Sequence, residues 1–310
     1  MTLGLIFFVL GAGLAIWATE RLLEGLVGLA ELTRISTFTL GAVLSGLEAE
    51  NIAVGLAAGA AGQSSVALGV VFGGATFLLC VALGLGAILF PLQVHLSRGV
   101  LAAMACAPVI AGCALLGDTT PRLAGAVLLI VFVAAMVYIV RNSARRAFAP
   151  QGEIKEALEK HRSWPVALLL TVVGLSVITL GGELVSAGAS RLITAFRIPA
   201  LFMGMVVTPA VIELEEVARQ AIPAREGRPE VSAGNLVGTL LFFVLATLGL
   251  VALFTPVRVD PEVRTLDWPF LVALTWLVVA LLARGRVGRR EGAVLLALFG
   301  VYIRLHVVVR

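Results

Sequence analysis

The sequence predicts an all-α polytopic membrane protein, with ten transmembrane helices arranged as two inverted-topology five-helix repeats. Of its 310 residues, 60% are hydrophobic and only 14% are charged, and the mean hydropathy is +1.05. A soluble globular domain has no use for so much apolar surface. Apolar stretches long enough to cross a bilayer recur along the whole chain. The second half of the chain also repeats the pattern of the first.

The ten predicted spans are stretches of about 20 apolar residues, separated by clusters of Gly, Pro or charged residues. No basic residue precedes the apolar core at the N-terminus, so we expect the first stretch to remain as a spanning helix rather than to be cleaved as a secretory signal. The predicted helices cover residues 3–30, 37–60, 65–90, 97–116, 122–141, 164–189, 200–221, 230–255, 267–284 and 290–308.

The internal repeat is clearest around two clusters of acidic residues. "TERLLEGLVGLAELTRI" (Thr19 to Ile35) matches "GELVSAGASRLITAFRI" (Gly182 to Ile198), and further on "LEAENIA" matches "IELEEVA". Each half holds five spans, so the second half enters the membrane from the opposite side. This predicts repeat 1 at 1–141, a linker at 142–163 and repeat 2 at 164–310, the architecture of many secondary transporters.

The basic residues predict how the chain is oriented. Lys and Arg concentrate in the Arg141 to Trp164 connection, whose "GEIKEALEK" portion could form a short surface helix, and in "RGRVGRR", Arg284 to Arg290. The positive-inside rule therefore puts loop 142–163 in the cytoplasm and both termini outside, in what we expect to be a prokaryotic cytoplasmic membrane. The excess of 23 Lys and Arg over 19 Asp and Glu is too small to suggest nucleic acid. The first expected partner is the lipid bilayer.

Five glutamates interrupt two of the apolar stretches. A charged side chain at the centre of a bilayer costs on the order of 2.5–3.5 kcal/mol, so we expect these glutamates to face the protein interior or water. They are Glu48, Glu50, Glu213, Glu215 and Glu216.

Helical spacing sorts these residues into two sets. Glu48 shares a face with Asn51, and Glu213 shares one with Glu216, because residues three apart are neighbours on a helix. Each of these faces predicts half of an ion site between the repeats. Glu50 and Glu215 point about 160° away and could face a second cavity or a flanking ion site. Arg219 could pair with Glu215. Otherwise few fixed cations lie nearby, which indicates a mobile, hard cation.

The two clusters and the stretches after them resemble the cation/Ca²⁺ exchanger superfamily, of the sodium/calcium exchanger type. The similarity spans almost the whole chain. "LGAVLSGLEAENIAVGLAAGAAGQSSVALGVVFGG" and "MGMVVTPAVIELEEVARQAIPAREGRPEVSAGNLVGT" lie where that family carries its "GTSLPE"-like and "GNVxGSNxxN"-like motifs. The resemblance implies two inverted five-helix repeats and an ion site on the second and third helices of each.

The motifs are altered at the ion-binding positions. Counted back from Gly69 and Gly234, the motif serine falls on Glu48 and Glu213, the proline on Glu50 and Glu215, and the glutamate on Asn51 and Glu216. The last motif asparagine becomes Leu78 and Phe243. In such exchangers the serine and asparagine positions resemble Na⁺ ligands, so their replacement implies altered ion selectivity. Crowded carboxylates suit proton coupling.

We therefore predict a secondary-active antiporter that exchanges a hard cation, Ca²⁺ or a similar divalent ion, for H⁺ or Na⁺. A Na⁺/H⁺ antiporter, or a cation channel with the same glutamates, stays open as an alternative. No catalytic constellation, cofactor motif or metal-ligand spacing of Cys and His is present, so we expect neither an enzyme nor a bound cofactor. The predicted cation ligands are Glu48, Asn51, Glu213, Glu216, Glu50, Glu215, Thr208, Asn235 and Thr239, with Glu48, Glu213 and Glu216 as the carboxylates on a metal ion.

Overall fold

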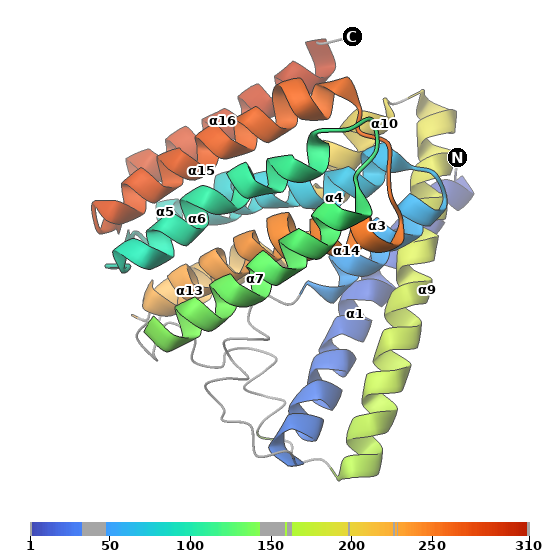
Figure 1. The fold of residues 1–310 in the computed structure, drawn as a ribbon, viewed down its shortest axis with the longest axis horizontal. Coiled ribbons are helices and arrows are strands. Elements are labelled where there is room, and N and C mark those ends of the chain that lie inside the picture. Colours follow the sequence, from blue (N-terminus) through green and yellow to red (C-terminus); the bar gives the residue numbers. More distant parts are fainter. Residues whose placement is uncertain are drawn as a thin grey trace.

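The computed structural model describes residues 2–32, 48–142, 159, 163–197, 199–225, 227 and 229–308, and these residues are almost entirely helical. Two long helices, α1 and α9, stand beside a stack of inclined helices (Figure 1). The helices are α1 (Thr2–Leu32), α3 (Ala49–Ala60), α4 (Ser64–Phe77), η1 (Leu78–Ala82), α5 (Leu83–Leu89), α6 (Arg98–Ala111), η2 (Gly112–Leu115), α7 (Arg122–Asn142), α9 (Trp164–Phe196), α10 (Ala200–Phe202), η4 (Met203–Val207), α11 (Thr208–Ile212), α12 (Leu214–Arg225), α13 (Pro229–Leu241), η5 (Phe242–Thr247), α14 (Leu248–Phe254), η6 (Val263–Asp267), α15 (Trp268–Ala283) and α16 (Arg289–Val308).

Seven helical stretches among the described residues are long and apolar enough to cross a membrane. They are Thr2–Leu29, Ser64–Leu89, Arg98–Leu115, Arg122–Asn142, Trp164–Phe196, Pro229–Phe254 and Val263–Ala283. The prediction of an all-helical membrane protein is confirmed. Three other spans were predicted. The first part of 37–60 lies outside the described residues, and 200–221 is broken into shorter helices. The span predicted at 290–308 is α16, which carries several charged side chains.

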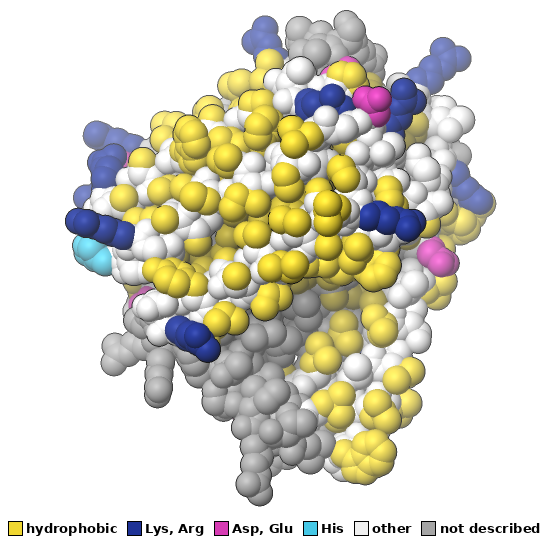
Figure 2. Space-filling model, viewed as in Figure 1, with side chains coloured by type: hydrophobic (Ala, Val, Ile, Leu, Met, Phe, Trp, Pro, Cys, Tyr) yellow, Lys and Arg dark blue, Asp and Glu magenta, His cyan; other side chains and the backbone are white. Residues whose placement is uncertain are grey.

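The surface seen in Figure 2 is mainly apolar, with most Lys and Arg side chains toward its margins. Large hydrophobic side chains are exposed along the outer helices, for example Leu123 and Ile130 on α7 and Leu169 on α9. A soluble protein does not tolerate a contiguous apolar surface of this kind. These side chains suit contact with lipid tails.

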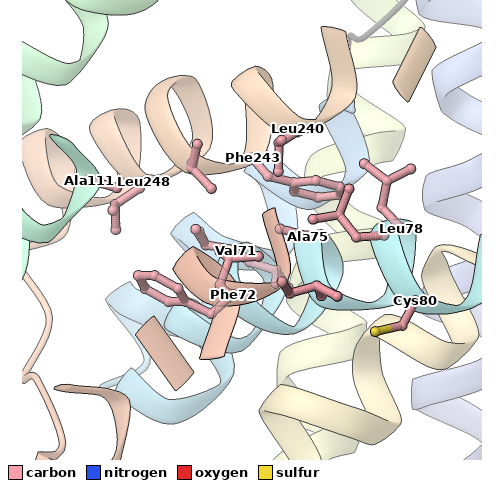
Figure 3. Close-up of a cluster of buried hydrophobic side chains, with 14 of the residues drawn as sticks. Val71, Phe72, Ala75, Leu78, Cys80, Ala111, Leu240, Phe243 and Leu248 are labelled. Atoms are coloured by element: carbon pink, nitrogen blue, oxygen red, sulfur yellow. The ribbon is translucent and has the colours of Figure 1, made fainter. Parts of the chain in front are cut away.

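Two helical rods form the centre of the stack. One runs from α4 through η1 to α5, the other from α13 through η5 to α14, and nearly all of their residues are buried. Each contains a π-helical turn, a feature often found near functional sites. Val71, Phe72 and Ala75 of the first rod lie close to Leu240 and Phe243 of the second (Figure 3). This cluster is the core of the molecule.

The two rods occupy equivalent places in the two halves of the chain. They begin at Ser64 and Pro229 and end at Leu89 and Phe254, so both ends are 165 residues apart. The helices before them, α3 and α12, keep the same spacing. Both connections turn at a glycine with positive φ, Gly62 at 73° and Gly227 at 74°, a conformation that glycine adopts without strain.

The long helices α1 and α9 pack against each other in antiparallel orientation. Gly4 near the start of α1 approaches Gly188 in the second half of α9, and Gly25 in the second half of α1 approaches Ala167 near the start of α9. The two helices therefore run in opposite directions. Small residues at these points let the backbones come close, as in many membrane helix pairs. In α9, Gly181 lies against Ala15 of α1.

Helix α4 makes an equally close contact with η4. A Cβ atom placed on Gly69 would overlap the backbone carbonyl of Gly204, and one placed on Gly204 would overlap the carbonyl of Ser65. The second predicted helix of repeat 2 is therefore held by backbone contact against the third helix of repeat 1. At the other end of α5, short antiparallel strands β1 (Leu92–Gln93) and β2 (Arg286–Val287) join two connections.

Several predicted boundaries differ from the structure. The helix predicted at 164–189 continues to Phe196, and the one predicted from 267 begins with a π turn at Val263. The stretch predicted as one helix over 200–221 is interrupted at Glu213 and extends to Arg225. The predicted surface helix in loop 142–163 lies almost wholly outside the described residues.

Candidate functional site

The two acidic clusters lie where a helix begins, and not within a continuous span as expected. Glu48 immediately precedes α3, with φ −100° and ψ 70°, and Glu213 stands between α11 and α12, with φ −86° and ψ 9°. The backbone carbonyl of Glu48 accepts a hydrogen bond from the backbone amide of Asn51, and that of Glu213 accepts one from the amide of Glu216, each at 3.1 Å. Glu48 thus sits at the positive end of the α3 dipole, which stabilises negative charge, whereas Glu213 lies between the C-terminus of α11 and the N-terminus of α12, whose dipoles oppose each other there.

The prediction that the glutamates face the interior is confirmed for those whose side chains are described. Glu48, Glu50 and Glu213 are each 1% exposed, and Glu216 is fully buried. The Glu215 side chain lies outside the described part. Buried carboxylates require a cation, a proton or several hydrogen bonds to be stable. The partners of these four groups therefore decide what the site can do.

Glu48 and Glu216 both contact the same arginine. Nη1 of Arg219 lies 2.8 Å from Oε1 of Glu48 and 2.8 Å from Oε1 of Glu216. The second oxygen of Glu216 accepts a 2.9 Å bond from Nδ2 of Asn235. Residues of α3, α12 and α13 are joined in this way, so carboxylates from the two halves of the chain meet at one guanidinium.

This arrangement corrects one premise of the sequence analysis. We expected few fixed cations near the carboxylates, yet Arg219 lies directly between two of them. Its contact with Glu216 could have been read from their three-residue spacing on one helix. Its contact with Glu48 joins residues 171 positions apart, and nothing in the sequence indicates it. The expected pairing of Arg219 with Glu215 falls outside the described side chains.

Further predicted ligands surround this centre. Glu48 lies within electrostatic range of Glu50, Glu213 and Glu216. Asn51 is 1% exposed, and within the described residues neither its Oδ1 nor its Nδ2 has a hydrogen-bond partner. The same holds for Oε2 of Glu48 and Oγ1 of Thr239. Buried polar atoms are seldom left unbonded in proteins, so these atoms are suited to receive a ligand or water.

Thr208 makes a local bond instead. Its hydroxyl donates to the carbonyl oxygen of Met203 at 2.9 Å, across the π turn η4. The hydroxyl oxygen retains lone pairs, so the residue stays a possible ligand, but its proton is already used.

Glu50 points away from the centre, as its helical position predicts. Its Oε2 lies 2.7 Å from Oγ1 of Thr19 on α1, and the same hydroxyl lies 3.0 Å from the carbonyl oxygen of Ala15. A hydroxyl carries one proton, so Thr19 can donate to only one of these two oxygens at a time. This contact links the acidic helix α3 to the long helix α1.

The three carboxylates predicted on a metal ion do not form a preassembled metal site. Across the described ranges, no three His, Cys, Asp or Glu side chains come together closely enough to hold a metal ion. Instead, the guanidinium of Arg219 lies between Glu48 and Glu216. The assignment of Glu48, Glu213 and Glu216 as cation ligands stays a prediction.

The sequence analysis missed a second buried polar cluster, between α15 and α16. The Tyr302 hydroxyl donates to Oδ1 of Asp267 at 2.6 Å, and Nε2 of His306 lies 2.9 Å from the same oxygen. Asp267 and Tyr302 are fully buried, and His306 is 6% exposed. The four-residue spacing of Tyr302 and His306 was the available signal, because it places both on one helix face.

Comparison of the sequence with known proteins shows which family the chain belongs to. A sequence profile of the sodium/calcium exchanger protein family matches residues 3–141 and 166–308, nearly the whole chain. The chain belongs to the sodium/calcium exchanger protein family. This confirms the resemblance drawn from the acidic clusters. It also makes the chain an integral membrane protein of a transporter family.

Relatives of this exchanger-family protein match it from end to end. The inner membrane protein YrbG of Escherichia coli is 28% identical over 318 residues, which cover 98% of this chain and 97% of YrbG. The putative antiporter CaxA of Alkalimonas amylolytica is 25% identical over 96% of this chain and 97% of its own. An uncharacterized membrane protein of Methanocaldococcus jannaschii, MJ0091, is 24% identical, with 98% of both chains covered.

Solved structures share the fold. The sodium-calcium exchanger NCX_Mj, soaked with Na⁺ and Sr²⁺, aligns with a TM-score of 0.59 at 21% identity, covering 100% of this chain and 99% of its own. The same exchanger soaked with Na⁺ and no Ca²⁺ aligns with a TM-score of 0.58 at 23% identity, with the same coverage. At such low identity the likeness supports the fold and not the details of the site.

Proposed function

We propose that this protein is a secondary-active antiporter that moves a hard divalent cation, Ca²⁺ or a similar ion, in exchange for H⁺ or Na⁺. One observation carries the proposal. Buried carboxylates from equivalent helices of the two halves, Glu48 and Glu216, converge on a single positive group. Such a site has the charge and the oxygen ligands for a hard cation. Membership of the exchanger family supports the same function.

The ligand set of the transported cation would come from both halves. Glu48, Glu213 and Glu216 supply the carboxylates, and Asn51, Asn235 and Thr239 supply neutral oxygens, with Thr208, Glu50 and Glu215 nearby. At an effective dielectric constant of about 20, each unit charge 4 Å from a monovalent ion contributes about 4 kcal/mol. Neutralising one carboxylate should therefore lower the affinity for a divalent ion by a large factor. The chemistry is ion exchange and involves no catalytic residue or cofactor.

The proposed architecture is ten spans in two inverted repeats, 1–141 and 164–310. It is supported by the 165-residue spacing of α3–α5 and α12–α14. The antiparallel packing of α1 and α9, which are equivalent helices in the repeat, also supports it. Opposite orientation of equivalent helices is what an inverted repeat requires. In this arrangement loop 142–163 faces the cytoplasm and both termini face outside.

Alternating access would come from movement of α1 and α9 past the buried core. Among the described residues, two sets of polar contacts tie this pair to the acidic helix and its connection. Thr19 of α1 bonds Glu50, and the side-chain amide of Gln63 donates to the carbonyl and hydroxyl oxygens of Ser186 on α9, both at 3.1 Å. Small residues such as Gly182 and Ala53 also meet where α9 packs against α3, and helices can slide across such contacts.

The counter-ion follows from the altered ligands. Carboxylates stand at positions where the family carries neutral Na⁺ ligands, and a carboxylate can exchange a metal ion for a proton. Proton binding and cation binding would then compete at Glu48 and Glu213. Only a site that is loaded or protonated would reorient, because an uncompensated charge is costly in the membrane.

The test uses purified protein in sealed liposomes with a pH dye inside and a trapped cation gradient. Proton movement on addition of Ca²⁺ identifies H⁺ as the counter-ion, and Ca²⁺ movement driven only by a Na⁺ gradient identifies Na⁺. Glu213→Gln should abolish exchange in a folded protein. Glu183→Gln removes an exposed glutamate of α9 and should not change exchange.

The proposal is wrong if no counter-ion is needed for flux, which indicates a channel. It is also wrong if Glu213→Gln exchanges cations at the rate of the unaltered protein.

A further inference from the structure

We propose that Arg219 is a tethered competitor of the transported cation. Its guanidinium takes the position between Glu48 and Glu216, and the cation binds there when the guanidinium withdraws. Arg219 thereby selects for divalent cations. This inference rests on the proposed function, since it concerns the same site.

The contact geometry places the arginine where a bridging cation would lie. One nitrogen, Nη1, lies 2.8 Å from an oxygen of each carboxylate. That nitrogen carries two protons, one for each acceptor. A Ca²⁺ ion would need oxygens at about 2.3–2.6 Å, so the nitrogen and a bridging ion cannot be present together. Binding of the cation between these carboxylates therefore requires Arg219 to leave.

Arg219 has a path by which it can leave. Its side chain is 24% exposed, whereas those of Glu48 and Glu216 are 1% and 0% exposed. The arginine thus runs from the accessible side of α12 into the buried cluster on a flexible stem. It cannot be neutralised by losing its proton, so it vacates the site only by moving.

Replacement of the guanidinium by a bound cation favours divalent over monovalent ions. A monovalent ion that displaces the guanidinium leaves the charge of the site unchanged and loses two charge-assisted hydrogen bonds. A divalent ion adds one positive charge among carboxylates that remain negative. When no cation is bound, the guanidinium returns and spares Glu48 and Glu216 the cost of buried, unpaired charge.

The first experiment measures Ca²⁺ binding to purified protein by calorimetry, with Na⁺ as competitor. Arg219→Gln should bind Ca²⁺ at least about tenfold more tightly, because one charge near a titrating site shifts its affinity by about 10- to 1,000-fold. The variant should also become more sensitive to Na⁺. Arg225→Gln removes the same charge from an exposed position on the last turn of α12 and should leave both values unchanged. Equal or weaker Ca²⁺ binding by folded Arg219→Gln overturns the inference.

A second experiment uses the unaltered chain, since Arg219→Gln leaves Glu48 and Glu216 without their guanidinium and could fail to fold. Phenylglyoxal modifies accessible arginines, and mass spectrometry reports the modified fraction at each position. Added Ca²⁺ should raise modification of Arg219 and leave that of Arg225 constant. Modification of Arg219 that falls or does not change overturns the inference.

The two proposals fail in different ways. If the unaltered protein exchanges no Ca²⁺ with either H⁺ or Na⁺, the proposed function is wrong. If exchange proceeds but the Ca²⁺ affinity or the modification of Arg219 does not change as described, the antiporter stands, and Arg219 instead holds the carboxylates in position.

Discussion

Replacement of Tyr302 by Phe tests whether the buried cluster between α15 and α16 holds the last helix in place. The substitution removes only the hydroxyl, which donates to Oδ1 of Asp267 at 2.6 Å. Both residues are fully buried, so water cannot replace the bond. A hydrogen bond to a charged group contributes about 1.5–3 kcal/mol, and a buried acceptor that loses a donor pays a desolvation penalty of similar size. His306, 2.9 Å from the same oxygen, remains as a partner. We therefore expect a loss of about 1.5–3 kcal/mol.

The assay is thermal or denaturant unfolding of purified protein in detergent. Tyr138→Phe makes the same chemical change at a side chain that is 45% exposed on α7 and should change stability by less than about 0.5 kcal/mol. A double-mutant cycle with Asp267→Ala, which removes the acceptor oxygen, should give most of the loss as coupling between the two positions. Equal stability of Tyr302→Phe and Tyr138→Phe, or no coupling in the cycle, would refute the reasoning.

Two further substitutions test the packing and the link between the moving pair and the core. Gly69→Ala places a methyl group against the Gly204 carbonyl and should destabilise the protein by about 1–3 kcal/mol or more. The control Gly13→Ala places its methyl group in open space and should be tolerated. A thermal shift for Gly69→Ala no larger than that for Gly13→Ala contradicts the close contact. Thr19→Val leaves the buried Glu50 without its hydroxyl partner and should destabilise the protein by about 1–3 kcal/mol and slow exchange in liposomes. The control is Thr179→Val, at an exposed threonine of α9 whose hydroxyl donates to the Leu175 carbonyl of its own helix. Equal behaviour of both variants would show that the Thr19 contact has no role.

The sequence was most informative where the signal is local. Apolar stretches, their lengths and the recurrence of "LEAENIA" and "IELEEVA" predicted the membrane class and the equivalence of the two halves. Glu48 and Glu213 stood out because a carboxylate in an apolar stretch is costly in lipid wherever the chain folds. The break of the chain at Glu213 was missed, because helical periodicity cannot show that a helix stops for one residue and resumes.

Contacts between distant residues depended on how the helices pack. Arg219 was visible in the sequence, but its partner Glu48 lies on another helix 171 residues away. Likewise Thr19 reaches Glu50 across 31 residues, and Asp267 reaches Tyr302 across 35. Hydropathy and spacing report which face of a helix is polar, and not which other helix that face meets.

The sequence by itself determined that this chain spans a membrane and that its acidic residues must be buried. These properties follow from the free energy of transferring each side chain into lipid, which is additive along the chain. The tertiary structure alone decided that two of those carboxylates share one arginine, that Glu50 faces α1, and that Asp267 is joined to the last helix. Such pairings form only when close helix packing brings polar groups within about 3 Å of each other, where each partner offsets part of the other's cost of burial.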